Sequence, residues 1–526
     1  MTDQAKFSLD DDSVVVIVGS GAGGGTLANE LAQRGVKCVV LEAGKHYTQA
    51  DFENDEWAMF NKISWLDKRI SAGGWHHTKT YPNLPAWIVK GVGGSTVHWS
   101  GVALRFQEHD FHTKTTYGAI DGANVLDWPI TLSELEPYYE LAEKKMGVCG
   151  TKASGLPPMP PNNHYKVIEA GARKVGYKHI VRPAASNSEP YDGRPGCMQI
   201  GFCMQGCKIG AKWSTLYTEV PRAQATGNVE LRPESMVLQI QHDKQGRANG
   251  VLYVDNKGRK QLQKARVVCV AGNSIESPRL LLNSASSMFP NGLANSSGQV
   301  GKNYMNHATA AAVSIHKKPV YMYRGFDIAA VVADEVPLNT KRGFVGGYYL
   351  EGLAIHLPYT AAFMKPGGWG RDFTSAMEMY DHMSCVWVCG EDMAREQNTI
   401  TLHPTEKDQY GLPIPIVTKT YHENDEKITA HGLVQWRKVS EAVGATRVID
   451  MPAYPASHNM GTNRMSAKAS DGVVNRWGQA HDVKNLFISD GSQFTSSSAA
   501  NPTLTIVALA IRQAEYIAGA LNRREI

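Results

Sequence analysis

The feature that most constrains this chain is a glycine-rich turn near its N-terminus. An apolar run, Val14 to Val18, leads directly into Gly19-x-Gly21-x-x-Gly24. In such a turn the first glycine permits the bend, the second lets the backbone approach a pyrophosphate, and the third lets helix and strand pack closely. The amides that open the following helix favour an anion. The turn therefore predicts a βαβ unit that binds a dinucleotide.

The residues after the turn complete this unit. We expect a helix over Thr26 to Arg34, ended by Gly35, and a second strand over Lys37 to Leu41. Glu42 follows that strand, where a carboxylate can accept hydrogen bonds from ribose hydroxyls. Both NAD and FAD fit this pattern, so the turn alone does not choose between them.

The composition is that of an ordinary soluble globular protein, with 42% hydrophobic and 20% charged residues among 526. This length allows two or more domains. A net charge of +4, from 54 basic and 50 acidic residues, gives no reason to expect a nucleic acid or an anionic membrane as partner. We expect no direct membrane span, because no apolar run reaches roughly 18 residues. We also expect no export signal at the polar, acidic N-terminus.

Later segments repeat features of the opening. Lys90 to Gly101 includes the adjacent glycines Gly93 and Gly94, which indicate that backbone comes close to a bound group. Arg266 to Asn283 has the pattern of another strand, glycine turn and helix. The tail from Val483 predicts a strand, a loop and a helix that return to the first domain.

From Thr309 to about Thr420 the pattern changes to alternating, aromatic-rich runs separated by turn clusters. This predicts an antiparallel sheet in a separate lobe. The expected fold class is therefore α/β, with a Rossmann-like cofactor domain and a second, mainly antiparallel substrate lobe. The predicted boundaries are 1–110, 208–308 and 450–526 for the cofactor domain, and 111–207 and 309–449 for the substrate lobe, which includes the loop 197–207.

Three local elements are also predicted. Leu132 to Met146 and Asp425 to Val443 have amphipathic periodicity and should be helices, with Ser133 and Asn424 as N-caps. Val229 to Leu238 should be one strand.

Three of the eight cysteines are crowded into a loop as Cys197-x5-Cys203-x3-Cys207. Eight cysteines in this length do not make a disulfide scaffold. Three thiolates in a glycine-containing loop can converge on a metal centre. A structural zinc normally takes four ligands, and no fourth Cys or His is close in sequence. A disulfide with one free thiol is possible in an oxidising compartment but leaves the glycines unexplained. The third interpretation is a three-iron, four-sulfide (3Fe-4S) cluster, which takes three cysteines.

With these segments placed, the chain resembles the glucose-methanol-choline (GMC) oxidoreductase family, flavoproteins that oxidise alcohols with FAD. The resemblance covers nearly the whole cofactor domain and the middle lobe only loosely. It rests on the opening turn with Glu42 and on four further motifs in the family's order: Gly93-Gly94-x-x-x-His98-Trp99, Ala271-Gly-Asn-Ser-x-x-Ser-Pro278, Val300-Gly-Lys-Asn303 and Asn485-Leu-x-x-x-Asp490-Gly-Ser.

The resemblance implies how FAD is held. Glu42 would bind the adenosine ribose, the amides of Gly19 to Gly24 the pyrophosphate, and Val237 the adenine side. Asp490 would lie near the pyrophosphate or the ribityl chain. His98 departs from the commoner members, which have Asn nearby, and resembles sugar-oxidising members in which this histidine is bonded covalently to the flavin. A histidine that only packs or hydrogen-bonds beside the ring is the alternative.

The resemblance also supplies a catalytic pair. Alcohol oxidation by a flavin requires removal of the hydroxyl proton and departure of a hydride toward flavin N5. A neutral imidazole, with an ordinary pKa of about 6.5, suits the first task. His458 matches the family's catalytic base, and Asn501 matches the partner that orients the hydroxyl. His307 is a weaker competitor for the role of base.

The cysteine spacing resembles that of family members that pass electrons to a cytochrome. It therefore favours the 3Fe-4S cluster and an FAD-dependent dehydrogenase with a c-type cytochrome as acceptor. The overall pattern favours a sugar or glycoside as substrate. The favoured reaction is oxidation of glucosides at C3 to a 3-keto sugar, and gluconate, glucose or a polyol are the alternative substrates. Such members often have a small companion subunit that carries an export signal. Co-export with it would place this chain in the periplasm, and the cytoplasm is the alternative.

Two rival functions stay open at this point. The first is an oxygen-using sugar oxidase without a cluster. The second is a flavin-binding assembly or electron-transfer subunit without its own substrate site.

Overall fold

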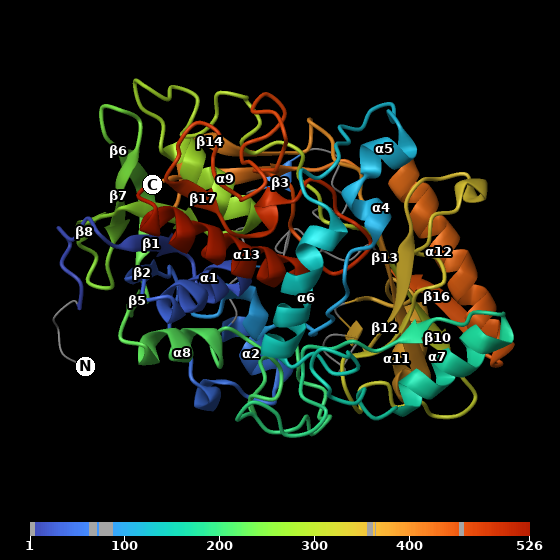
Figure 1. Ribbon diagram of the computed structural model, residues 1–526. Coiled ribbons are helices and arrows are strands. Elements are labelled where there is room, and N and C mark those ends of the chain that lie inside the picture. The colour runs from blue at the N-terminus through green and yellow to red at the C-terminus, as the bar shows by residue number, and fades with distance from the viewer. Residues whose placement is uncertain (1–5, 63–70, 73–87, 355–360, 363, 452–456) are drawn as a thin grey trace.

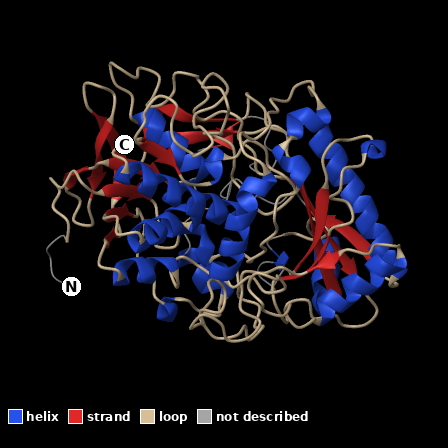
Figure 2. Ribbon diagram, viewed as in Figure 1, coloured by secondary structure: helices blue, strands red, loops and turns tan. Residues whose placement is uncertain are grey.

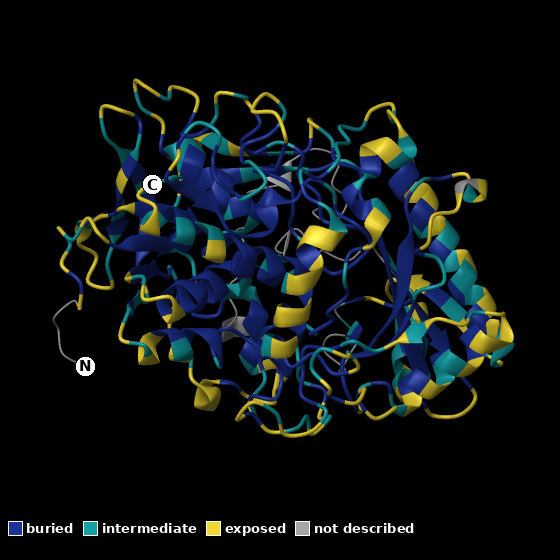
Figure 3. Cartoon of the chain, viewed as in Figure 1, coloured by how far each residue is buried: buried dark blue, intermediate teal, exposed yellow. Residues whose placement is uncertain are grey.

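The protein forms two adjacent lobes in a computed structural model, in which residues 6–62, 71–72, 88–354, 361–362, 364–451 and 457–526 are described. Figure 1 shows the first lobe, with both termini, on the left and the second, with the long helix α12 (Glu423–Ala442), on the right. The strands between the lobes are buried, whereas loops and outer helix faces are exposed (Figure 3). The functional residues predicted from the sequence come from both lobes.

A five-stranded parallel sheet forms the centre of the first lobe and confirms the predicted Rossmann-like fold. Its strand order is β17 (Leu486–Ile488), β9 (Val267–Val270), β1 (Val15–Val18), β2 (Cys38–Leu41) and β5 (Val229–Arg232). Strands β1, β2, β9 and β17 are continuous apolar runs because both faces of the sheet are covered, whereas the edge strand β5 contains Glu230 and Arg232. Val15 and Ile17 pack on the side of helices α1 (Ala22–Gln33) and α13 (Thr503–Asn522).

A three-stranded meander covers the opposite face of the parallel sheet. It consists of β6 (Met236–His242), β7 (Ala248–Val254) and β8 (Lys260–Lys264), and it packs with Val16 in the main core. The predicted single strand over Val229 to Leu238 is therefore wrong. The chain leaves the parallel sheet at Pro233, which has no amide hydrogen for a ladder, and Glu234 has a φ of 51°. The break moves the following residues into a different sheet.

A six-stranded antiparallel sheet forms the second lobe, as the alternating pattern predicted (Figure 2). Val386 and Val388 point to one face and pack under α12 and α7 (Asn163–Lys174), whereas Trp387 points to the other face, toward the first lobe. The strand order is β16 (Arg447–Met451), β10 (Ala308–Ile315), β13 (Met383–Gly390), β12 (Tyr348–Leu353), β11 (Ile328–Val332) and β4 (Ile180–Val181). The predicted domain boundaries stay a prediction.

The remaining elements connect or flank these layers. A third sheet consists of β14 (Thr399–Lys407), β15 (Pro413–Thr418) and β3 (Ser71–Ala72). The other α-helices are α2 (Glu56–Lys62), α4 (Glu108–Phe111), α5 (Thr113–Tyr117), α6 (Leu132–Met146), α8 (Glu219–Ala225), α9 (Asn273–Asn283) and α11 (Arg371–Glu378). Short 3-10 helices are η1 (Gln49–Asp51), η3 (Gly94–Val97), η4 (Thr340–Arg342), η5 (Tyr380–His382) and η6 (Gly491–Gln493).

Two predicted helices are present, but both N-caps differ from the prediction. Helix α6 is capped by Thr131, whose hydroxyl accepts a hydrogen bond from the Glu134 amide at 3.3 Å, and not by Ser133. Helix α12 is capped by His422 and not by Asn424. In both helices an acidic side chain three residues after the cap bonds back to the cap's backbone, and this reciprocal pairing decides where the helix starts.

Among the described residues, helix α13 meets the length and composition criteria for crossing a membrane. However, 72% of its apolar window is buried inside the protein, and core helices meet the same criteria. We treat α13 as a core helix because it packs against α1 and the parallel sheet.

Candidate active site

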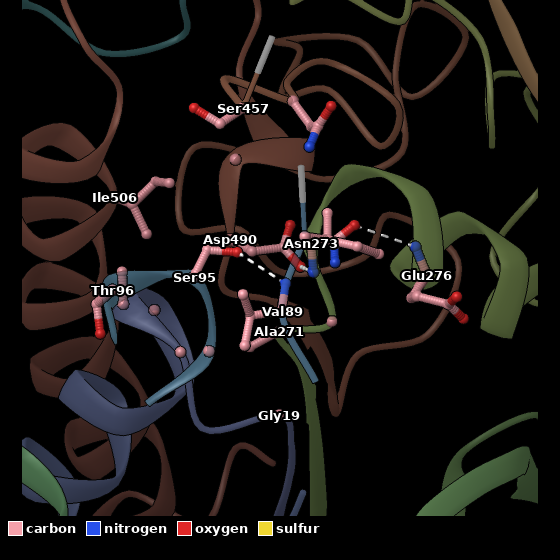
Figure 4. Close-up of a pocket in the computed structure, with 18 of the residues that line it drawn as sticks. Gly19, Val89, Ser95, Thr96, Ala271, Asn273, Glu276, Ser457, Asp490 and Ile506 are labelled. Carbon is pink, nitrogen blue, oxygen red and sulfur yellow. Dashed lines mark hydrogen bonds between the residues drawn. The ribbon is translucent and has the colours of Figure 1, made fainter. Parts of the chain in front are cut away.

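A long cavity lies where the carboxyl ends of the parallel strands meet the inner face of the antiparallel sheet. This edge of an open α/β sheet is the usual ligand site. Figure 4 shows residues from three segments around it: Gly19 from the opening turn, Ala271 and Asn273 from the turn that leads from β9 into α9, and Asp490 from the tail. The predicted site residues that line it are Gly19, Gly21, Glu42, Gly94, His98, Val237, His458, Asp490 and Asn501.

The opening turn leaves no room for side chains. Gly19 has a φ of 97°, and a Cβ on it would lie 2.4 Å from the Ala271 carbonyl oxygen. A Cβ on Gly24 would lie 2.1 Å from the Gly19 oxygen. Gly24 therefore does not line the cavity but lets α1 pack against the turn, which is the role expected of the third glycine.

The second glycine loop is fastened to the first. The Gly93 amide donates a hydrogen bond to the Ser20 hydroxyl at 3.1 Å, and a Cβ on Gly94 would lie 2.8 Å from the Gly21 Cα. Gly93 thus supports the cavity from behind, while Gly94 and Gly21 form part of its wall. A cradle of bare backbone of this kind suits a bound dinucleotide.

Glu42 lies at one end of the cavity and is buried. Its carboxylate accepts hydrogen bonds from the Ser20 amide at 3.0 Å, the Ser20 hydroxyl at 2.7 Å and the Gly44 amide at 2.9 Å. Burial raises the pKa of this carboxyl, and the bonds from Ser20 and Gly44 oppose the rise. Val237 lines the cavity near the same end of the parallel sheet. The ribose and adenine roles of these residues stay predictions.

Asp490 joins the returning tail to the turn before α9. One carboxylate oxygen accepts hydrogen bonds from the Asn273 amide at 2.9 Å and the Ser277 hydroxyl at 2.5 Å. The other accepts from the amide and hydroxyl of Ser492 at 2.8 Å and 2.5 Å. Figure 4 shows the bond between Asp490 and Asn273 at the centre of the site. Asp490 therefore fixes two loops that converge on the cavity.

His458 and Asn501 meet at the other end of the cavity. The distance from His458 Nε2 to Asn501 Nδ2 is 3.5 Å, and His458 Nδ1 lies 2.8 Å from His307 Nδ1. His307 Nε2 lies 3.3 Å from the Ser497 carbonyl oxygen. A carbonyl can only accept, so His307 carries its proton on Nε2 and accepts at Nδ1. His458 must then donate from Nδ1, which leaves a lone pair on its Nε2 beside Asn501.

Both histidines are held in the neutral form. Burial lowers the pKa of His307 to about 4. Burial lowers the pKa of His458 well below its ordinary value, and the proximity of His307 adds to the effect because two protonated rings would repel each other. The thiol of Cys389 lies 3.1 Å from His307 Nδ1 and 3.4 Å from the Ala499 carbonyl oxygen. These contacts favour His307 as a partner that orients His458, and the choice of His458 as the base stays a prediction.

Sequence reasoning missed two cavity residues of the second lobe. Glu351 on β12 is fully buried, and neither carboxyl oxygen has a hydrogen bond of normal geometry. Burial raises its pKa to about 8, while the nearby Asn501 amide opposes the rise. Trp387 on β13 lies opposite Glu351, and its indole nitrogen is buried without a partner. The available signal was a glutamate inside an otherwise apolar strand, which is rare for a buried position.

His98 and Trp99 follow η3 and line the cavity. Burial lowers the pKa of His98 to about 3, and the positive charge of Lys212 adds to the effect. The imidazole is therefore neutral, which suits both a covalent bond to a flavin and simple packing beside it. The covalent bond stays a prediction.

The cysteine loop adjoins this end of the cavity. The Lys212 ammonium donates hydrogen bonds to the carbonyl oxygens of Trp99 at 2.6 Å and Cys203 at 2.5 Å, so it ties the loop to the His98 segment. All eight cysteines are free thiols, so no disulfide forms within the loop. The Gln199 and Lys212 amides donate to the sulfurs of Cys197 and Cys207, both at 3.4 Å. Such amide–sulfur bonds also tune iron–sulfur clusters.

The fold and the cavity are those of an α/β protein whose bare-backbone loops suit a dinucleotide, with a neutral histidine at the junction of its two lobes. The chain belongs to the GMC oxidoreductase family, because residues 5–309 match the family's N-terminal model and residues 394–510 its C-terminal model, both described as GMC oxidoreductase. Enzymes of this family bind FAD and are oxidoreductases that act on alcohols or sugars.

Curated relatives extend over nearly the whole chain. The 2-methyl-1,2-propanediol dehydrogenase of Mycolicibacterium austroafricanum is 33% identical over 96% of this chain and 95% of that protein. The fructose dehydrogenase large subunit of Gluconobacter japonicus is 27% identical over 97% of this chain and 98% of that protein. The solved structure of pyridoxine 4-oxidase from Mesorbium loti has a TM-score of 0.63 at 14% sequence identity, and the match covers 96% of this chain and 99% of that one. This similarity supports the fold.

Proposed function

We propose that the chain is an FAD-dependent dehydrogenase that oxidises a hydroxyl of a sugar or glycoside. The observation that carries the proposal is the arrangement of His458, whose unprotonated Nε2 faces Asn501 inside the cavity. A neutral imidazole with a free lone pair is a general base. His458 lines the same cavity as the bare-backbone loops, which supports a position beside a bound flavin.

The residues divide the reaction between them. His458 Nε2 takes the hydroxyl proton, and the side-chain amide of Asn501 orients the hydroxyl oxygen. The carbon–hydrogen bond breaks with its electron pair, so the alcohol carbon becomes a carbonyl. FAD, when bound, supplies the acceptor for that hydride. The low pKa of His458 keeps the base form populated at neutral pH.

The favoured substrate is a glucoside, oxidised at C3 to a 3-keto sugar, with gluconate, glucose or a polyol as alternatives. Similarity at 53–60 and 65–68 to glucoside-oxidising proteins supports this choice, and residues 65–68 lie outside the described part of the chain. The relatives named for a propanediol and for fructose support a polyhydroxylated substrate.

The proposed acceptor is a c-type cytochrome, reached through a 3Fe-4S cluster on Cys197, Cys203 and Cys207. Three free thiols, two of them with amide hydrogen bonds, make a suitable ligand set. The loop is tied to the His98 segment by Lys212, and Met204 lines the cavity. A cluster there would supply one-electron steps close to the flavin.

The proposed partners include a small companion subunit that brings the folded chain to the periplasm, with the cytoplasm as the alternative location. The relative named as a large subunit supports an assembly with further chains. Co-purification of the chain with the products of neighbouring genes, followed by cell fractionation, tests both points.

Iron and acid-labile sulfide analysis of the anaerobically purified chain tests the acceptor. We expect three iron atoms per chain, lost in Cys203→Ser and retained in the control Cys385→Ser, a buried thiol in β13. Reduction by a panel of sugars, followed by reoxidation with oxygen or cytochrome c in separate experiments, completes the test. An iron-free protein that oxygen rapidly reoxidises would instead be a sugar oxidase.

A further inference from the structure

We propose that Glu351 and Trp387 form a subsite that binds a second substrate hydroxyl, on the carbon next to the one that is oxidised. The inference rests on the proposed function and narrows its substrate class to vicinal diols. It assigns a role to two residues that the reaction itself does not use.

The pair is built into the antiparallel sheet. Glu351 and Trp387 are directly opposite each other in the register of β12 and β13, so their side chains leave the same face. Both line the cavity, together with the apolar side chains of Ile328 and Leu353. Val386 and Val388, which flank Trp387, pack on the other face under α12. The alternation of the strands therefore fixes the direction of both side chains.

The cavity end contains several polar atoms without hydrogen bonds among the described residues. These are both carboxyl oxygens of Glu351, the indole nitrogen of Trp387 and the side-chain oxygen of Asn501. Buried polar atoms are nearly always hydrogen-bonded, so such a group in one cavity points to a polar ligand. Together they offer two donors, the indole N–H and the O–H of the protonated Glu351 carboxyl, and several acceptor oxygens, and a hydroxyl can use both kinds of group.

The position of the pair indicates which hydroxyl it would bind. The Trp387 ring lies 5.2 Å from the His458 ring, measured between centroids. The Asn501 amide is the group near Glu351 that opposes the rise in its pKa. Because His458 and Asn501 hold the reacting hydroxyl, a hydroxyl on Glu351 and Trp387 belongs to an adjacent carbon. Glu351 is mostly protonated at neutral pH, which suits a neutral hydroxyl better than a substrate ammonium group.

The test compares a substrate with its deoxy analogues. The sugar or polyol that reduces the flavin fastest is compared with analogues that each lack one hydroxyl, by anaerobic stopped-flow measurement of kcat/KM for flavin reduction. We expect kcat/KM to be about 100-fold lower, or lower still, for the analogue without the adjacent hydroxyl, because the subsite is left with unpaired polar atoms. Removal of a hydroxyl remote from the reacting carbon should lower kcat/KM by a smaller factor.

The variants identify the residues responsible. Glu351→Leu should lower kcat/KM for the intact substrate much more than for the deoxy analogue, so the ratio between them falls to about 10 or below. Glu351→Gln, which keeps donor and acceptor groups, should retain most of the ratio. Trp387→Phe should reduce it partly, whereas Trp436→Phe, which removes a buried indole N–H behind the sheet, should not.

An unchanged ratio in both Glu351→Leu and Trp387→Phe would overturn the inference, and so would a wild-type protein that does not discriminate against the deoxy analogue. Absorbance of bound FAD and the thermal unfolding midpoint show that each variant is folded. If no alcohol or sugar reduces the wild-type flavin, the proposed function fails, and the inference fails with it. Flavin reduction without discrimination leaves the proposed function standing.

Discussion

His307 Nδ1 accepts a hydrogen bond from His458 Nδ1 at 2.8 Å, and this contact fixes which nitrogen of His458 is free to act as a base. The carbonyl of Ser497 sets the His307 tautomer, and His307 in turn sets that of His458. The two rings meet edge to face, with 4.9 Å between their centroids. His458 is therefore oriented by His307, which lies directly before β10, and through it by Ser497 in the loop after η6.

Replacement of the base itself gives the first prediction. His458→Ala should slow anaerobic flavin reduction by about 10²- to 10⁴-fold, the usual contribution of a positioned general base. Bound FAD should be retained, because the glycine loops and Asp490, which are predicted to hold the cofactor, are unchanged. Stopped-flow absorbance of the flavin measures the rate. Sugar-dependent reduction at the wild-type rate would favour a flavin-binding assembly subunit without its own substrate site.

Loss of the orienting partner gives the second prediction. His307→Phe keeps an aromatic ring but removes the acceptor for His458, so its tautomer is no longer fixed. We expect flavin reduction to slow by about 10- to 100-fold, less than in His458→Ala. The control is Cys389→Ala, which leaves the contact between the histidines in place and should remain close to wild type. Equal rates in the two variants would show that His307 does not orient the base.

The depressed histidine pKa values give the third prediction. His307 and His458 are neutral when folded but bind protons below about pH 6.5 when unfolded. The unfolded state therefore gains protons as the pH falls from 6.5 toward 4, and stability is lost over that window. The rate constant for flavin reduction should stay level down to well below pH 6.5. A midpoint near 6.5 in the rate profile would contradict the burial of His458.

The raised pKa of Glu351 acts in the opposite direction and gives the fourth prediction. Its carboxyl ionises near 8 in the folded protein and near its ordinary value of about 4.3 when unfolded. The free energy of unfolding that this carboxyl contributes is therefore lost as the pH rises from about 4.3 toward 8. Glu351→Leu removes this effect and should raise the free energy of unfolding at pH 7 by about 2 to 4 kcal/mol. Urea titrations at pH 5 and pH 8 should show the larger gain at pH 8.

The glycine turn and the strands that follow it could be predicted from the sequence, and the two residues predicted as the catalytic pair line one cavity, while their roles stay a prediction. Each rests on a local signal or on a motif with fixed spacing, such as Gly19 to Gly24. The cavity positions of Glu351 and Trp387 could not be predicted, because the register of β12 and β13 sets them. Nor could the contact between His307 and His458, which joins residues far apart in the sequence. Alternation in a sequence predicts that strands exist but not which strands are neighbours.

Lys212 gives the last prediction, because it links the cysteine loop to the cofactor cavity. Its ammonium is buried and donates hydrogen bonds to three carbonyl oxygens, those of Val97, Trp99 and Cys203. Lys212→Met keeps the length of the side chain but leaves these buried acceptors unpaired, at about 1 to 3 kcal/mol each. We expect a lower thermal unfolding midpoint and less FAD per purified chain, measured by absorbance.

The matched control for Lys212→Met is Lys208→Met, because Lys208 lies in the same segment with an exposed side chain. The control should keep the wild-type midpoint and FAD content. Loss of Lys212 also removes the positive charge that lowers the pKa of His98, so that pKa should rise. A Lys212→Met protein with full FAD and an unchanged midpoint would show that the two loops hold their positions without this lysine. If the FAD content of the Lys212→Met protein falls while its iron is retained, Lys212 acts on the His98 segment and not on the cysteine loop.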